Sequence, residues 1–136
     1  GEGKLREELQ QKTVDLGLEE KVCFTGIRSD VNRLMQAMDI FVFPSIYEGL
    51  GIALIEAQAS GLPCIISDKI PNDGIVVKEL VTKRSLEDSS EEWARHILSR
   101  VNVPRMDTSN EIREHGFDIK ETSKWLERFY IEKTEK

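Results

Sequence analysis

Two glutamates bracket a short glycine-containing stretch in the middle of the chain, Glu48 on its amino side and Glu56 beyond it. Gly49-Leu50-Gly51 lies between them and comes directly before an apolar segment that is typical of a helix. The first turn of a helix leaves backbone N–H groups unpaired and carries partial positive charge, so it attracts phosphate. Glycines let an anion come close to the backbone. A phosphate bound at this helix start would lie within reach of Glu48.

Carboxylates accept hydrogen bonds from hydroxyl groups, so a sugar or a ribose suits both acids. Residues 40–67 contain only these two charged side chains, in a chain of which 32% is charged. Because a carboxylate is costly to bury, we expect Glu56, inside an apolar run, to be held by something that binds it. The pattern predicts a ligand that joins a sugar, a phosphate and a ribose.

The elements around this stretch alternate between helix and strand. We expect helices at about 3–16, 29–38, 52–60, 89–101 and 119–133, and strands at 22–25, 40–43, 63–67 and 80–82. The strands are apolar without alternation, which indicates an α/β fold with a Rossmann-like parallel sheet of three to four strands and helices on both faces. Such sheets bind ligands beyond the carboxyl ends of their strands, and Glu48 stands at such an end.

Composition narrows the classes of partner. The 136 residues suffice for one domain, and a net charge of −6 with mixed signs argues against nucleic acid. No run reaches the roughly 18 apolar residues that span a membrane. Cys23 and Cys64 lie in apolar runs outside any C-x-x-C pair, so we expect two buried free thiols in a reducing, cytoplasmic compartment. His96 and His115 lack the spacing of metal ligands.

The run from Phe43 to Ala57, followed by Ser60-Gly61-Leu62-Pro63, resembles the E-x7-E signature of the retaining glycosyltransferases of family four. The resemblance extends back through 38–40 and 22–26 to the first five residues. The tail around Gly116–Lys120 is similar to the ending of bacterial capsule and exopolysaccharide transferases.

This resemblance implies a GT-B enzyme with two Rossmann-like domains, of which residues 1–136 form part of the C-terminal, nucleotide-sugar-binding one. It implies that Glu48 is catalytic and contacts hydroxyls of the transferred sugar, while Glu56 binds the ribose. The distal phosphate would lie on the amides of the turn, and Arg28 would be near the base. The implied donor-binding residues are Glu48, Gly49, Leu50, Gly51, Ile52, Glu56 and Arg28.

The resemblance also implies the partners. The donor would be a UDP- or GDP-sugar, bound without a metal or other cofactor, and the acceptor a glycan or lipid-linked sugar in cell-surface polysaccharide synthesis. The parent enzyme would work in the cytoplasm, either free or at the inner face of the plasma membrane. We expect the 136 residues alone to be inactive, because the family's diphosphate-gripping basic residues and its acceptor domain lie upstream.

Two strands that separate 22–25 from 40–43 in the family have no counterpart in this sequence. Either these two strands pair directly, or another chain covers the open edges, as in a homodimer. Two other functions also stay open at this point: a nucleotide-binding or regulatory module without transfer activity, and an interaction domain with a Rossmann-like core. The glycines could form a plain turn, and Glu56 could be a core acid paired with an arginine.

Overall fold

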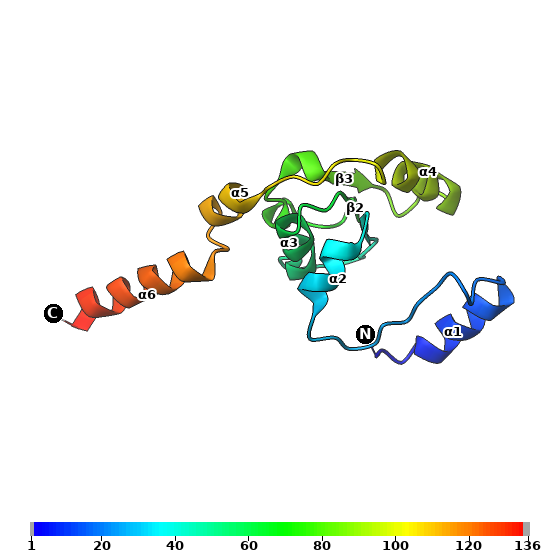
Figure 1. Cartoon of the computed structure of the whole chain (residues 1–136), viewed down its shortest axis with the longest axis horizontal. Helices are drawn as coiled ribbons and strands as arrows, with labels where there is room; N and C mark the ends of the chain where they lie inside the picture. The colour runs from blue at the N-terminus through cyan, green and yellow to red at the C-terminus, as the bar shows by residue number, and fades with distance from the viewer. Residues whose placement is uncertain (1, 135–136) are drawn as a thin grey trace. The chain divides into compact units, whose positions relative to one another are not determined.

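The computed structural model describes residues 2–134, shown in Figure 1. They fall into two compact units, one ending at Val31 and one beginning at Asn32, and each is described by itself. Within the described residues, no helix is long and apolar enough to cross a membrane.

The first unit contains one helix, α1 (Arg6–Asp15), none of whose residues is buried. Gly17 ends the helix in the left-handed conformation, at a φ of +64°, and its N–H donates to the carbonyl of Val14. The predicted strand at 22–25 is wrong, since this segment has no strand assignment. A strand requires a hydrogen-bonded neighbour, and the described residues give this segment none.

The second unit is built on a parallel sheet of three strands, which confirms the predicted fold class. β1 (Phe41–Phe43), β2 (Cys64–Ser67) and β3 (Val81–Arg84) lie in this order. Phe43 pairs with Ile66, and Ser67 with Arg84. β2 is completely buried, as its unbroken apolar sequence predicts. β1 is only half covered, with Val42 37% exposed, because β1 is an edge strand of the described sheet.

Helix α3 (Ile52–Ala59) connects β1 to β2 and supplies much of the core. Leu54 and Ala57 are fully buried against Leu62, Cys64 and Ile66. Met35 of α2 (Val31–Ala37) joins the same cluster. The other side of α3 faces the loop after β2: Ile55 packs with Val76, Val77 and Leu80. The loop itself contains two short 3-10 turns, Asn72–Gly74 and Lys78–Leu80.

The segment after residue 104 contacts the core through Arg105. The Arg105 guanidinium donates to the carbonyls of Ser60 at 2.7 Å and Met35 at 2.9 Å, and also to that of Met38. It therefore ties the carboxyl ends of α2 and α3 together, where backbone carbonyls lack partners within their helices.

Helix α4 (Ser90–Arg100) begins with a capping box, which the run Ser89-Ser90-Glu91-Glu92 predicts. The Ser89 hydroxyl accepts from the Glu92 N–H, and the Glu92 carboxylate accepts from the Ser89 N–H at 2.8 Å. That second bond lowers the pKa of Glu92. Trp93 packs at the helix start, as expected, and its indole N–H donates to the carbonyl of Ser85 at 2.9 Å.

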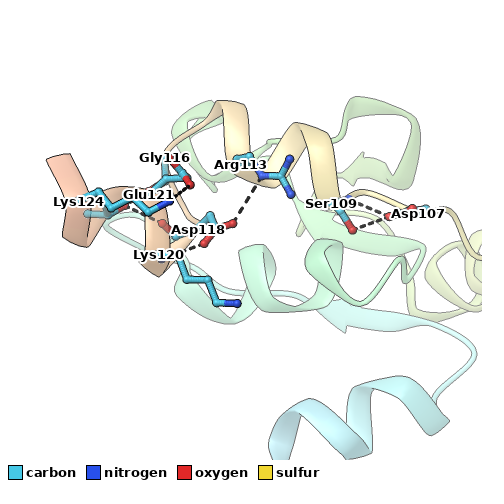
Figure 2. A network of polar contacts seen from close by, with 9 residues as sticks. Asp107, Ser109, Arg113, Gly116, Asp118, Lys120, Glu121 and Lys124 are labelled. Atoms are coloured by element: carbon cyan, nitrogen blue, oxygen red, sulfur yellow. Dashed lines mark hydrogen bonds and ion pairs between the residues drawn. The ribbon is translucent and has the colours of Figure 1, made fainter.

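Two helices follow, and Figure 2 shows the polar contacts between them. Asp107 accepts from the Ser109 N–H and hydroxyl at the start of α5 (Ser109–Glu114), a helix that the sequence patterns missed. Asp118 accepts from the Lys120 N–H at 2.9 Å and pairs with Arg113 at 3.6 Å. The bond from Lys120 is the main reason that the pKa of Asp118 is lowered. Asp118 thus caps the last helix and joins it to α5.

The last helix, α6 (Ile119–Thr134), has the predicted position, but the spacing of its apolar residues Ile119, Leu126 and Phe129 also predicts a buried face, and this is wrong. None of its described residues is buried, and Trp125 is 56% exposed. Its aromatic side chains instead pack on each other, with the Trp125 and Phe129 rings stacked at 5.5 Å. The amphipathic pattern predicts a helix correctly, but burial needs a second surface.

The cysteines differ from the prediction in one respect. Both are free thiols, but Cys23 is exposed while Cys64 is fully buried in β2. Cys23 was expected to be buried because a strand was expected there, and an unpaired segment has no sheet to bury it. Burial raises the pKa of the Cys64 thiol to about 12.

We expect iodoacetamide at about pH 8 to alkylate Cys23 and to leave Cys64 unmodified in the folded protein, because the reagent reaches the exposed Cys23, while burial shields Cys64 and keeps its thiol protonated. Mass spectrometry of peptides from native and urea-treated protein would measure both sites. Alkylation of Cys64 at the rate of Cys23 without urea would contradict the buried position of β2.

We expect Ser89→Ala to lower the free energy of unfolding by about 1 kcal/mol, because the Glu92 N–H loses its capping acceptor. Urea denaturation near neutral pH would measure the change. Ser90→Ala is the matched control: Ser90 is the next residue along and does not cap the helix. Equal losses in both variants would contradict the capping role of Ser89.

Candidate functional site

The glycine turn joins the carboxyl end of β1 to the amino end of α3. Gly51 occupies the N-cap position of α3 with φ +73° and ψ +56°, a left-handed conformation that side chains with a Cβ adopt at a cost. A Cβ at this position would meet only ordinary contacts, the nearest at 3.8 Å, so backbone conformation rather than space requires the glycine. Within residues 2–134, no side chain caps the first turn of α3. The Leu54 N–H donates to the Gly51 carbonyl at 2.8 Å, and the N–H groups before it have no side-chain partner, so they can bind an anion.

Glu48 lies half-buried in the loop that leads into this turn. Its Oε1 atom lies 2.8 Å from the Ser45 hydroxyl, which orients the carboxylate. The Ser45 carbonyl in turn accepts from the buried Ser67 hydroxyl at 2.6 Å, and Ser67 accepts from the Lys69 N–H at 3.0 Å. These contacts fix the start of the Glu48 loop to the carboxyl end of β2. Glu48 forms no ion pair with a described residue, so its charge is available to a ligand.

Ser45 and Ser67 are functional candidates that the sequence patterns missed. Both come at or just after the carboxyl end of a strand, the position that pointed to Glu48, and that signal could have found them. A serine between apolar residues has no distinctive spacing, so only the structure shows what it bonds to.

Glu56 is exposed, and the expectation that it sits in an apolar environment is wrong. The buried residues of α3 are Leu54, Ile55, Ala57 and Gln58, so position 56 falls on the outward face together with Ile52. The segment is apolar because most of it enters the core, while the helical period turns residue 56 to the outside. No described cation pairs with Glu56, so the core acid–arginine pair is absent from the part of the chain that the structure describes.

Arg28 belongs to the first unit, and its charge is already compensated there. Its guanidinium makes two parallel bonds to Asp30, at 2.8 Å and 2.7 Å. These bonds raise the pKa of Arg28 and lower that of Asp30. The predicted site residues from Glu48 to Ile52 follow one another between β1 and α3. Glu56 lies one helical turn further along α3. Arg28 belongs to the other unit.

A buried amide supports the turn from behind. Gln58 is fully buried, and its Nε2 donates to the carbonyls of Leu54 and Gly74 at 3.0 Å and 2.7 Å. Its Oε1 accepts from the N–H groups of Val76 and Val77 at 2.9 Å and 2.8 Å. Gln58 was not predicted as a site residue, although a glutamine among apolar helix positions is an available signal.

Among the residues that the structure describes, no three acidic, histidine or cysteine side chains group as they would to hold a metal ion. The turn and its surroundings bring together backbone N–H groups, two carboxylates and serine hydroxyls.

Comparison with known proteins places the chain in a family. The family model for glycosyl transferases group 1 matches residues 1–117. EpsF of Bacillus subtilis (strain 168) is 37% identical over 139 residues, which cover 100% of this chain and 36% of EpsF. The UDP-Gal:alpha-D-GlcNAc-diphosphoundecaprenol alpha-1,3-galactosyltransferase of Escherichia coli is 38% identical over 80 residues, 58% of this chain and 21% of that enzyme. This chain thus spans about a third or less of these relatives.

A solved structure agrees with the fold. WaaG, a glycosyltransferase involved in lipopolysaccharide biosynthesis, matches with a TM-score of 0.62 and 25% identity, over 70% of this chain and 26% of the WaaG chain. The chain belongs to the glycosyl transferases of group 1, as its E-x7-E segment predicted.

Proposed function

We propose that the chain forms the donor-binding part of a retaining glycosyltransferase that moves a sugar from a UDP- or GDP-sugar to a glycan or lipid-linked acceptor. The observation that carries the proposal is the amino end of α3, which begins at a left-handed Gly51 and has no side-chain cap in the described residues. Within this family, such a helix start next to an oriented carboxylate fits a sugar diphosphate.

In the proposed complex, the distal phosphate lies on the amides of Leu50, Gly51 and Ile52, with Gly49 providing space. The helix start then stabilises the negative charge that develops on the leaving nucleotide diphosphate as the sugar departs. These amides are fixed before the reaction, so they stabilise that charge without further rearrangement.

Glu48 contacts the transferred sugar in this proposal. The Ser45 hydroxyl holds one carboxylate oxygen at 2.8 Å, so the other is free to accept from a sugar hydroxyl. Glu56, on the outer face of α3, accepts from the two ribose hydroxyls, and its exposure leaves it accessible to them. Arg28 is assigned to the base, and engaging the base would require it to share or leave Asp30.

The names of the relatives support the class of donor and acceptor. The Escherichia coli relative is named for a UDP-galactose donor and a diphosphoundecaprenol-linked acceptor, and another relative, from Salmonella typhi, for Vi polysaccharide biosynthesis. We assign the reaction to cell-surface polysaccharide synthesis and to the cytoplasm, where free thiols such as Cys23 and Cys64 persist. Under the proposal, residues 1–136 bind the donor, and transfer needs the acceptor-binding part of a longer protein.

We expect Glu48→Gln in the full-length protein to lower kcat by about 10- to 100-fold, because a charged hydrogen bond to the sugar is lost in the transition state. The affinity for UDP or GDP, measured by calorimetry, should stay within about twofold. Neither nucleotide contains the transferred sugar, which is the group that Glu48 contacts in the proposal. Glu87→Gln, an exposed glutamate elsewhere in the chain, is the control. A variant with unchanged kcat would remove Glu48 from the catalytic role.

We expect Glu56→Ala to raise the Kd for UDP or GDP by about tenfold, because the ribose loses a charged acceptor worth roughly 1.5 kcal/mol. The matched control is Ala59→Ser, a polar change on another exposed position of α3. Calorimetric titration of the variants would measure this. If Glu56→Ala and Glu48→Gln changed affinity and kcat alike, the separate roles for sugar and ribose would fail.

A further inference from the structure

Gly74 packs directly on the glycine turn. A Cβ built at this position would lie 2.3 Å from the Leu50 carbonyl oxygen, and real Cβ atoms essentially never approach closer than 3.0 Å. The backbone conformation at Gly74 is not left-handed, so other residues could adopt it. Close approach to Leu50 is therefore the reason for a glycine here, whereas conformation is the reason at Gly51.

Gln58 holds Gly74 in this place. Its side-chain amide donates to the Gly74 carbonyl and accepts from the two N–H groups that follow, on Val76 and Val77. Gly74 is itself buried. Because each of these groups would lose a partner buried away from water, displacement of the loop is costly. The position of Gly74 is thus set from α3, the same helix whose start forms the turn.

The contact with Gly74 also fixes the direction of one amide of the turn. The peptide bond between Leu50 and Gly51 is trans and planar, so its C=O and N–H point in opposite directions. With the Leu50 oxygen seated against Gly74, the Gly51 N–H must point away from the loop. A rotation of this peptide plane would move both groups together.

We propose that Gly74 is a positioning residue for donor binding: held by Gln58, it seats the Leu50 carbonyl and so aims the Gly51 N–H at the distal phosphate. This inference rests on the proposed function, because it assigns the Gly51 amide to a phosphate. It adds that the loop after β2, through Gly74, influences the affinity of the turn for the diphosphate.

Gly61 provides a control for the strain of an added Cβ. A Cβ there would lie 2.4 Å from the Met106 carbonyl oxygen, nearly the same clash as at Gly74, and the φ of +68° at Gly61 adds backbone strain that is absent at Gly74. Gly61, however, follows the carboxyl end of α3, while the turn forms its amino end. An alanine at position 61 would displace Met106 at the carboxyl end of α3. An alanine at position 74 would displace Leu50 at its amino end.

The experiment compares Gly74→Ala, Gly61→Ala and the unaltered full-length protein in calorimetric titrations with UDP, GDP, uridine and guanosine. We expect Gly74→Ala to raise the Kd for the nucleoside diphosphate by about 10- to 100-fold and to leave the Kd for the nucleoside unchanged, because only the phosphate contact is misplaced. Gly61→Ala should change neither. Amide NMR without ligand should show the Gly51 resonance shifted in Gly74→Ala alone.

A measurement on the unaltered protein covers the case in which an alanine variant does not fold. If the loop positions the turn, a nucleotide diphosphate on the turn must stabilise the loop by the same coupling free energy. We expect UDP or GDP to slow hydrogen exchange at the Val76 and Val77 amides, and unchanged exchange there would overturn the inference. Normal diphosphate affinity in folded Gly74→Ala would overturn it as well. Failure of the unaltered protein to bind either nucleotide would instead overturn the proposed donor site, and with it this role.

Discussion

The structure depends on a helix start whose first N–H groups have no side-chain partner, while the inner face of the helix is buried. The buried residues of α3 are Leu54, Ile55, Ala57 and Gln58, and the chain closes the other end with a left-handed Gly61. A side-chain cap would be the ordinary way to stabilise the amino end, but it would occupy the groups that an anion needs. The described chain stabilises the turn from behind instead, through Gln58 and the close contact between Gly74 and Leu50.

This arrangement explains why both sides of the turn are tied to β2 or its following loop. On one side, Ser67 at the end of β2 holds the carbonyl of Ser45, whose hydroxyl orients Glu48. On the other side, the loop after β2 holds Leu50. β2 is the central strand of the described sheet and is completely buried, so it is the most rigid support available. The carboxylate and the amides are thereby held by one framework.

Sequence patterns predict correctly those structural features that depend on residues close together in the chain. The capping box at Ser89, the glycine ends of two helices and the unbroken apolar run of β2 all depend on residues close in the chain. The carboxyl-end rule for parallel sheets likewise leads from the strand pattern to Glu48. Family membership follows from the same short segment, because the two glutamates and the glycines between them occur together.

The wrong predictions concern features that depend on a distant surface. Residues 22–25 have the composition of a strand but no partner strand, and Cys23 is exposed for that reason. The α6 helix has an apolar face with nothing described against it. Glu56 was expected to be buried because its neighbours in the sequence are apolar. That composition does not show which face of the helix position 56 lies on. Gln58 and Gly74 could not be connected from sequence, since their contact spans sixteen residues and a loop without regular pattern.

The return of the chain at Arg105 bears on how this fold tolerates change over evolution. Residues 105–108 pack across the carboxyl end of α3: Arg105 binds carbonyls of two helices, Met106 lies against Gly61, and the buried Thr108 donates to the Gln58 carbonyl at 2.9 Å. The segment that contains α4 thus connects two anchored parts of the chain, β3 and residues 105–108. Insertions and deletions among homologues should accumulate at its far end, around residues 101–104, where the chain length between anchors can vary while the framework beneath the turn stays the same.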